Sequence, residues 1–438
     1  MKDRIVVLGG GISGVGAAVL AKTKGFDVFV SDKGEITDDN RIVLLNNDID
    51  WEEGQHSIEN IVNADEIIKS PGIPDGTELI KHLTLHNIPV ISEIEFAFRY
   101  TNAKIAAITG TNGKTTTALL LGYILRNAGY DVLVAGNVGV GFSLSIAERD
   151  YDYIVLELSS FQLDGIKDFR SDVSIILNIT SDHLDRYDDI EHYAFAKFNI
   201  TKNQNKHDFL IYNADDILVK SIKTRARKIP ISLINKQEEG GYQHNNELII
   251  KLNNKTMTIQ ELALQGKHNM FNSMAAAMAA RVFEVKDTVI RQSMLDFQNV
   301  EHRLEHVLTV HGIDFINDSK ATNINSCWFA LESMQKDVIW IAGGVDKGND
   351  YSKLDEMVLD KVKAIICLGE NNQQIIKSFQ GKVDIIVQAS SMSEAVNQSF
   401  GLANKGEIVL LSPACASFDL FENYEDRGLQ FKNSVRLL

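Results

Sequence analysis

The sequence predicts an α/β protein built from three domains. Its 438 residues correspond to about three domains at roughly 150 residues each. Short apolar runs typical of buried strands alternate with longer helical stretches, which is the pattern of mixed α/β folds. Two such strands, at residues 5–8 and 105–108, run directly into a glycine-rich loop and a helix. We therefore expect open sheets whose binding loops lie where parallel strands end.

Charge and cysteine content exclude several classes of protein. The 44 basic and 59 acidic side chains give a net charge of -15, which would repel a polyphosphate backbone, so no nucleic-acid partner is expected. The three cysteines are widely spaced, which argues against a disulfide framework or a cysteine zinc site and fits a reducing cytoplasm. No apolar run is long enough to span a membrane, and the glycines of residues 9–16 argue against a secretory signal.

The opening of the chain predicts a Rossmann-like βαβ unit. A strand at residues 5–8 is followed by Gly9, Gly11 and Gly14, in the spacing G-x-G-x-x-G, then by a helix and a second strand. Such glycines let the backbone approach a pyrophosphate at a helix N-terminus. Asp32, about 20 residues further on, is placed to bind a ribose hydroxyl. The pattern does not distinguish NAD, FAD and nucleotide sugars, which all carry a pyrophosphate.

A phosphate-binding loop follows the strand at residues 105–108. Its sequence is Thr109-Gly110-Thr111-Asn112-Gly113-Lys114-Thr115-Thr116-Thr117. Loop amides of this kind cradle phosphates, the lysine brings a positive charge to the terminal phosphates, and the hydroxyl that follows it binds Mg²⁺. The loop departs from the general P-loop pattern because its first glycine is residue 110, whereas residue 108 is isoleucine. We expect a nucleoside triphosphate here.

An acidic residue and a histidine follow neighbouring strands of the same block. A strand at residues 153–158 carries Glu157 near its end, and a strand at residues 173–179 leads to His183. Loops after parallel strands share one edge of a sheet. We therefore expect Glu157, His183 and Thr115 to converge on Mg²⁺.

The remaining sequence predicts further strands and one buried helix. Asn253-Asn254 has the composition of a hairpin turn, and residues 270–283 form an alanine- and methionine-rich stretch typical of a buried helix. A last α/β block is expected from strands at residues 338–342, 364–368, 385–387 and 408–411.

A series of ordered motifs resembles the Mur ligases. They are GTNGKTTT, TSDHLDRY, HYAFAKFN, HNMFNSMAA, EHRLE, NDSKATN and SPACASFDLFENYEDRG, and they extend over essentially the whole chain. The last motif, with the glycine-rich opening, is most similar to the family member that adds D-glutamate. The resemblance implies a three-domain fold: a Rossmann-like domain for a UDP-sugar at residues 1–100, a central P-loop ATPase domain at 101–299, and a Rossmann-like domain at 300–438 that closes over ATP and the amino acid.

The resemblance also implies a reaction. ATP phosphorylates the carboxylate of UDP-N-acetylmuramoyl-L-alanine, and the amine of D-glutamate then attacks the acyl phosphate. A pair of Mg²⁺ ions is expected to take part, in a cytoplasmic, monomeric enzyme of peptidoglycan synthesis. Sister Mur ligases with another amino acid, and folylpolyglutamate synthase, which shares the central ATPase, remain alternatives.

The resemblance assigns roles to individual positions. Lys197 matches a lysine that becomes carbamylated, since an unmodified ammonium, with a pKa of about 10.4, would repel Mg²⁺. The residues implied in catalysis are Lys114, His183 and Lys197. The metal ligands implied are Thr115, Glu157, His183 and the carbamate of Lys197. The implied ATP-binding residues are Gly110, Thr111, Asn112, Gly113, Lys114, Thr115, Thr116, Asn269, Asn272, Arg303, Asp318 and Lys320. The UDP-sugar is expected at Ser13, Asp32, Ser70 and Asn137, and D-glutamate at Thr322, Lys347, Ser417, Phe418 and Tyr424.

Overall fold

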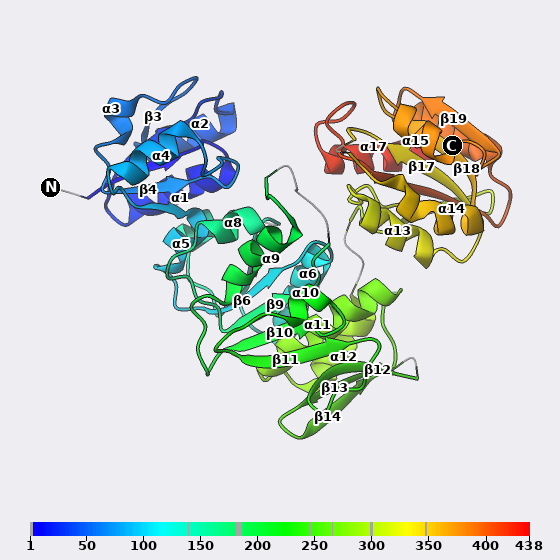
Figure 1. The fold of residues 1–438 in the computed structure, drawn as a ribbon, viewed down its shortest axis with the longest axis horizontal. Coiled ribbons are helices and arrows are strands. Elements are labelled where there is room, and N and C mark those ends of the chain that lie inside the picture. The colour runs from blue at the N-terminus through cyan, green and yellow to red at the C-terminus, as the bar shows by residue number, and fades with distance from the viewer. Residues whose placement is uncertain are drawn as a thin grey trace. The chain divides into compact units, whose positions relative to one another are not determined.

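The computed structural model describes residues 3–138, 140–180, 186–245, 247–264, 266–297, 301–346 and 348–438. It confirms a mixed α/β fold with three sheets (Figure 1). The chain divides into two compact units, Met1–Leu262 with Asn269–Phe297 and Ala263–His268 with Gln298–Leu438. Within the ranges described, no helix combines the length and the apolar character needed to cross a membrane.

The first sheet has the strand order expected of a Rossmann-like unit. Its order is β3-β2-β1-β4-β5, with every neighbouring pair parallel. The strands are β1 Arg4–Leu8, β2 Asp27–Ser31, β3 Asp50–Glu52, β4 Glu66–Lys69 and β5 Val90–Ser92. The helices are α1 Ile12–Thr23, α2 Asp38–Asn46, α3 Ile58–Ile61, α4 Glu78–Leu85 and α5 Glu93–Phe98. The predicted strand, glycine turn, helix and second strand at the start of the chain are all present.

The second sheet belongs to the same compact unit. Its order is β14-β13-β12-β11-β10-β9-β6-β8-β7, parallel from β7 to β12 and antiparallel beyond. The strands are β6 Lys104–Thr109, β7 Val132–Gly136, β8 Tyr153–Glu157, β9 Val173–Ile176, β10 Phe209–Asn213, β11 Arg227–Ser232, β12 Gly240–His244, β13 Glu247–Leu252 and β14 Lys255–Ile259. The helices are α6 Lys114–Asn127, α7 Phe142–Glu148, α8 Ser160–Asp164, α9 Ile190–Phe198, the 3-10 turn Asn199–Thr201, α10 Ile217–Lys220, α11 Lys267–Val282 and α12 Asp287–Asp296.

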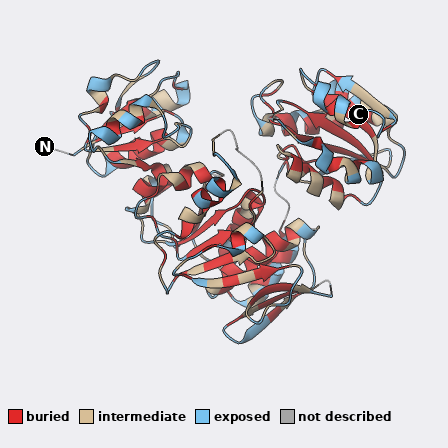
Figure 2. Ribbon diagram, viewed as in Figure 1, coloured by how far each residue is buried: buried red, intermediate tan, exposed pale blue. Residues whose placement is uncertain are grey.

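Two local predictions in this region are confirmed. Asn253 and Asn254 connect the antiparallel strands β13 and β14, with φ angles of 51° and 60°. Asparagine tolerates this left-handed backbone, which a two-residue hairpin turn requires. Helix α11 is buried along most of its length, as its alanine-rich sequence indicates (Figure 2).

The third sheet forms the core of the second unit. Its order is β15-β16-β20-β17-β18-β19, and only the pair β15 and β16 is antiparallel among the strands described. The strands are β15 Glu305–Val310, β16 Ile313–Asn317, β17 Val338–Gly343, β18 Val362–Leu368, β19 Ile385–Ala389 and β20 Ile408–Ala414. The helices are α13 Ile324–Ser333, the 3-10 turn Tyr351–Leu354, α14 Asp355–Lys361, α15 Gln373–Phe379, α16 Met392–Leu402 and α17 Tyr424–Arg436. The four predicted strands are present, and the hairpin β15–β16 was not predicted.

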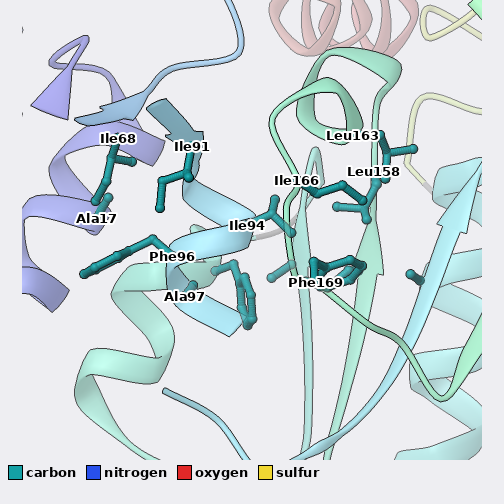
Figure 3. Close-up of a cluster of buried hydrophobic side chains, with 14 of the residues drawn as sticks. Ala17, Ile68, Ile91, Ile94, Phe96, Ala97, Leu158, Leu163, Ile166 and Phe169 are labelled. Atoms are coloured by element: carbon teal, nitrogen blue, oxygen red, sulfur yellow. The ribbon is translucent and has the colours of Figure 1, made fainter. Parts of the chain in front are cut away.

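Helix α5 joins the first two sheets. Its apolar side chains, among them Ile94 and Phe96, belong to a core cluster that also contains Phe169, from the segment that leads into β9 of the second sheet (Figure 3). Glu95 of the same helix is fully buried, and its Oε2 accepts the backbone N–H groups of residues 167, 168 and 169 at 2.8, 2.9 and 2.8 Å. One carboxylate therefore satisfies a whole turn of backbone donors.

Replacing Glu95 by alanine is expected to lower the free energy of unfolding by about 1–3 kcal/mol, because the buried N–H of Phe169 loses its acceptor. The N–H groups of residues 167 and 168, which are exposed, can bind water instead. Chemical denaturation, followed by circular dichroism, measures the change. Glu148→Ala is the matched control, since Glu148 is an exposed glutamate at the end of α7. Equal stability of the two variants would contradict the role given to Glu95.

Candidate active site

The phosphate-binding loop lies between β6 and α6, as predicted. Gly110 and Gly113 have φ angles of 149° and 85°, which residues with a Cβ rarely adopt. A Cβ on Gly113 would lie 2.3 Å from Oδ1 of Asn272, so this glycine lets the buried Asn272 of α11 pack against the loop. Asn269, one turn earlier, accepts a hydrogen bond from Nδ2 of Asn272 at 3.5 Å. The structure thus brings two predicted ATP-binding residues of α11 together with the predicted loop.

Asn178 holds this loop in place and was not among the residues predicted from the sequence. Its backbone carbonyl accepts from the N–H of Thr111 at 2.8 Å, and its Oδ1 accepts from the N–H of Asn112 at 2.9 Å. Its Nδ2 in turn donates to the carbonyl of Asn112 at 3.0 Å. Asn178 follows β9, which pairs with β6. Its position after a strand that neighbours β6 was the one feature of the sequence that could have indicated this role.

Two lysines meet at a single carbonyl oxygen. The Nζ of Lys114 donates to the carbonyl oxygens of Gly110 and Thr111 at 2.9 and 2.8 Å. The Nζ of Lys197, which is 1% exposed, donates to the same oxygen of Gly110 at 3.1 Å and lies 4.4 Å from the ring centre of Tyr193. Two ammonium groups this close repel each other in a buried setting. A negative charge on Lys197 would reverse the sign of this interaction.

The residues around Glu157 fit a divalent cation. The side chain is 2% exposed, and its Oε1 accepts from Nδ2 of Asn137 at 3.1 Å. Its Oε2 is buried and has no hydrogen-bond partner among the described residues, which is costly for a carboxylate unless a cation binds it. Thr115, also buried, lies in the first turn of α6, and β8 pairs with β6 so that Glu157 lies opposite residue 108. Carboxylate and hydroxyl oxygens suit Mg²⁺. His183 lies outside the described residues.

Three of the four predicted UDP-sugar residues, Ser13, Asp32 and Ser70, lie at the edge of the first sheet, whereas Asn137 follows β7 of the second sheet. A Cβ on Gly9 would lie 2.3 Å from Oγ of Ser70, and a Cβ on Gly14 would lie 1.8 Å from the carbonyl oxygen of Gly9. The glycines therefore allow the close approach of loop, helix and strand that the motif predicts. Ser13 is half-buried in the first turn of α1.

Asp32 fixes the glycine loop itself. Its Oδ2 accepts from the N–H of Gly10 at 2.5 Å and its Oδ1 from the N–H of Gly34 at 2.7 Å. Both carboxylate oxygens thus already bind backbone, a role that the sequence analysis did not predict. A ribose contact at Asp32 remains a prediction. The resemblance to the Mur ligases implies a small hydroxyl residue at position 33, which is a lysine here.

In the second unit, three loops meet where strands β16, β17 and β20 end. The N–H of Asp318 donates to the carbonyl of Leu411 at 2.7 Å, and that of Ala414 to the carbonyl of Ala321 at 2.9 Å. The N–H of Val345 donates to the carbonyl of residue 416 at 2.9 Å. These bonds join the motifs NDSKATN and SPACASFDLFENYEDRG to the loop that precedes Lys347. Lys347 itself lies outside the described residues.

The predicted D-glutamate residues differ in exposure. Ser417 is buried, Thr322 and Tyr424 are half-buried, and Phe418 is 71% exposed. The Nζ of Lys320, a predicted ATP-binding residue, lies 5.1 Å from the ring centre of Tyr424. The structure therefore brings predicted ATP and amino-acid residues of the second unit to one group of loops.

Asp318 is the most perturbed carboxyl group of these loops. It is 5% exposed, its Oδ2 accepts from Oγ of Ser412 at 2.9 Å, and its Oδ1 accepts from the N–H of Leu304 at 3.2 Å. Burial raises the pKa of Asp318 to about 7, although the guanidinium of Arg303 opposes the shift. Asp318 therefore changes its charge near neutral pH.

The raised pKa of Asp318 predicts a pH-dependent difference between the wild-type protein and Asp318→Asn. Between about pH 4 and pH 7 the folded wild type holds a proton that the unfolded chain has released, so its free energy of unfolding falls as the pH rises. Asparagine does not titrate. The stability of the variant relative to wild type should thus rise by a few kcal/mol across this window and level off above it. Thermal unfolding midpoints at several pH values measure the difference, and a constant offset would contradict the assignment.

Family models cover most of the chain. The Mur ligase middle domain matches residues 108–280, the Mur ligase, glutamate ligase domain matches residues 302–415, and the MurD N-terminal domain matches residues 4–79. Each range falls on one sheet, although β5 and the first four residues of β6 lie outside the matched ranges.

Relatives of similar length share about half of the residues. A UDP-N-acetylmuramoylalanine–D-glutamate ligase of Christiangramia forsetii is 50% identical over 445 residues, covering 100% of both chains. Proteins with the same name from Porphyromonas gingivalis and Salinibacter ruber are 50% and 42% identical, over 99% and 100% of this chain and 99% and 98% of theirs.

Solved structures with low sequence identity share the fold. A pseudomurein peptide ligase type C from Methanothermus fervidus superposes with a TM-score of 0.63 at 20% identity, covering 100% of both chains. MurF ligase from Thermotoga maritima in complex with ADP gives 0.63 at 15% identity over 96% of this chain and 99% of that one. The matches to family models and full-length relatives agree with the motifs in the sequence, and the chain belongs to the Mur ligase family.

Proposed function

We propose that the chain is an ATP-dependent ligase that joins D-glutamate to UDP-N-acetylmuramoyl-L-alanine. The relatives named for this reaction are about 50% identical over the full chain, which is the main support for the choice of amino acid. The meeting of Lys114, Lys197 and the loop at Gly110 supports phosphoryl transfer. The enzyme would act as a monomer in the cytoplasm, in peptidoglycan synthesis.

The reaction needs activation because a carboxylate and an amine do not condense spontaneously in water. An oxygen of the alanyl carboxylate attacks the γ-phosphorus of ATP and ADP leaves. The amine of D-glutamate then adds to the acyl carbon, loses a proton and expels phosphate, which carries away the carboxylate oxygen. No covalent bond to the enzyme is required, so its residues act by positioning and by neutralising charge.

The first unit would stabilise the phosphoryl transfer. Lys114 and the backbone amides at the start of α6 would bind phosphate oxygens. Glu157, Thr115 and a carbamate on Lys197, with His183, would hold Mg²⁺, which when bound neutralises phosphate charge. Asn137, hydrogen-bonded to Glu157, would contact the substrate near its reacting carboxylate. We propose that two Mg²⁺ ions bind.

The other ligands are assigned to each unit by itself. In the first unit, the UDP part would bind near Ser13, Asp32 and Ser70, at the N-terminus of α1, and Asn269 and Asn272 would bind ATP. In the second unit, ATP is assigned to Arg303, Asp318 and Lys320. The anionic D-glutamate side chain would be bound by Thr322, Lys347, Ser417, Phe418 and Tyr424.

The amino acid dependence of phosphate release tests this proposal. We expect the protein, given ATP, Mg²⁺ and UDP-N-acetylmuramoyl-L-alanine, to release phosphate with D-glutamate and not with L-glutamate, L-alanine or a diamino acid. Omitting the UDP-sugar should abolish release. Strong turnover with another amino acid and none with D-glutamate would refute the assignment and favour a sister ligase.

A further inference from the structure

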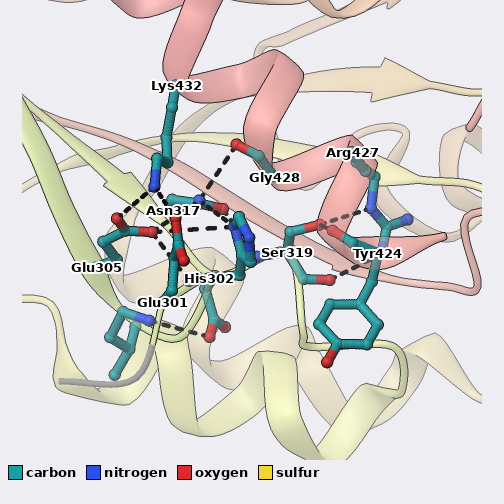
Figure 4. Close-up of polar contacts among 11 residues, drawn as sticks. Glu301, His302, Glu305, Asn317, Ser319, Tyr424, Arg427, Gly428 and Lys432 are labelled. Atoms are coloured by element: carbon teal, nitrogen blue, oxygen red, sulfur yellow. Dashed lines mark hydrogen bonds and ion pairs between the residues drawn. The ribbon is translucent and has the colours of Figure 1, made fainter. Parts of the chain in front are cut away.

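Arg427 lies at the centre of the loops of the second unit. It belongs to the first turn of α17 and is 1% exposed. Its Nε donates to Oγ of Ser319 at 3.0 Å, its Nη2 to the carbonyl of Ser319 at 2.8 Å, and its Nη1 to the carbonyl of Cys415 at 3.2 Å. Figure 4 shows the guanidinium, Ser319 and Tyr424 side by side. One side chain thus binds the loop after β16 and the loop after β20.

The same guanidinium also packs against the loop after β17. A Cβ on Gly344 would lie 3.3 Å from Nη1 of Arg427 and 2.1 Å from the carbonyl oxygen of residue 416. Oγ of Ser319 donates to the carbonyl of Tyr424 at 2.8 Å, which closes the connection back to α17. All three loops, and Tyr424 itself, carry residues that we assign to ATP or D-glutamate.

The charge of Arg427 is unusual for such a setting. Among the described residues no carboxylate forms an ion pair with it, and Asp318 and Asp419 act on it only at longer range. Burial lowers the pKa of Arg427 to about 10, so the group remains charged at neutral pH. Burying a charge costs free energy. Its hydrogen bonds go to backbone carbonyl groups of the loops and to a hydroxyl. The planar guanidinium holds these donors in a fixed fork, which the single ammonium group of lysine does not provide.

Gly428, the residue after Arg427, allows the first turn of α17 to approach His302 closely. A Cβ on Gly428 would lie 2.1 Å from Nδ1 of His302. The Nδ2 of Asn317 donates to the carbonyl of Gly428 at 3.3 Å and lies 2.9 Å from Nδ1 of His302 (Figure 4). The start of α17 is therefore also fixed to the segment that leads into Arg303.

We propose that Arg427 is a positioning residue for the amino-acid pocket, which sets the loops after β16, β17 and β20 relative to Tyr424. This inference rests on the proposed function, because the pocket is the one assigned to D-glutamate. The loops after β16 and β20 carry Thr322 and Ser417. A change at Arg427 would displace the hydroxyl groups of these two residues, so that they would no longer converge on one ligand. The UDP-sugar residues lie on the first unit and should be unaffected.

Steady-state kinetics of Arg427→Lys and Ser319→Ala test the inference. Lysine keeps the charge and loses the fork, while the milder Ser319→Ala removes one hydroxyl from the same network and guards against a variant that fails to fold. We expect Arg427→Lys to raise the KM for D-glutamate by about tenfold or more, with a smaller fall in kcat and a KM for the UDP-sugar within about twofold of wild type. Ser319→Ala should shift the same constant in the same direction by a smaller factor. Arg436→Ala is the matched control, since Arg436 is an exposed arginine on the same helix.

The outcomes separate this inference from the proposed function. If the wild type turns over with D-glutamate and both variants keep the wild-type KM for D-glutamate, the inference is overturned and the proposed function stands. A lowered melting temperature without a selective change in the KM for D-glutamate would also overturn it, because a merely structural role predicts that result. No D-glutamate-dependent turnover by the wild type would overturn the proposed function, and this inference with it.

Discussion

Replacing Lys197 by alanine is expected to lower the rate of D-glutamate-dependent phosphate release by about 100-fold or more, the size of loss found when one electrostatic stabiliser of a transition state is removed. The physical reason lies in the contact of Lys197 and Lys114 with the same carbonyl oxygen of Gly110. A carbamate on Lys197 would remove the repulsion between two ammonium groups and supply an oxygen ligand for Mg²⁺.

Chemical rescue separates the carbamate from an ordinary structural lysine. A short carboxylic acid added to Lys197→Ala should restore part of the activity, since its carboxylate can occupy the place of the carbamate. Lys206→Ala, which changes an exposed lysine of the same unit, should retain wild-type activity. Full activity of Lys197→Ala without rescue would contradict the carbamate.

Glu157→Gln is expected to reduce turnover by about 100-fold or more and to weaken the binding of divalent cations. The substitution preserves the size of the side chain but removes the charge from an oxygen, Oε2, that is buried without a hydrogen-bond partner among the described residues. A neutral amide is a poorer ligand for Mg²⁺ than a carboxylate. Initial rates give the first effect, and titration with Mn²⁺, followed by electron paramagnetic resonance in the presence of ATP, gives the second.

The metal titration is the more informative half of the Glu157 experiment. Glu148→Gln, an exposed change on α7 of the same unit, serves as control and should bind Mn²⁺ like the wild type. Unchanged Mn²⁺ affinity in Glu157→Gln would show that Glu157 does not ligate the metal, even if the activity falls.

The parts of the fold with strong local signals were predictable from the sequence. Continuous apolar runs revealed the buried parallel strands, and the glycines of the two strand–loop–helix units revealed where loops, helices and strands approach closely. The hairpin β15–β16 was missed because β15 is largely exposed and carries polar residues. Its tight turn at His311-Gly312, with φ angles of 51° and 82°, was the one local signal.

The supporting residues of the site were not predictable in the same way. Asn178 and Arg427 act through backbone groups 66 and 108 positions away in the chain. Such partners leave no spacing pattern, because they depend on which strands become neighbours. Asp32 shows the reverse case: its position was predicted, yet its carboxylate binds the amides of Gly10 and Gly34.

The path of one oxygen atom tests the proposed reaction most directly. UDP-N-acetylmuramoyl-L-alanine labelled with ¹⁸O in its alanyl carboxylate would be incubated with the protein, ATP, Mg²⁺ and D-glutamate, and the released phosphate analysed by mass spectrometry. An acyl phosphate predicts that each phosphate carries one oxygen from the carboxylate, because that oxygen becomes the bridge to phosphorus and leaves with it. Unlabelled phosphate, released in the same amount as the D-glutamate adduct, would contradict an acyl phosphate intermediate.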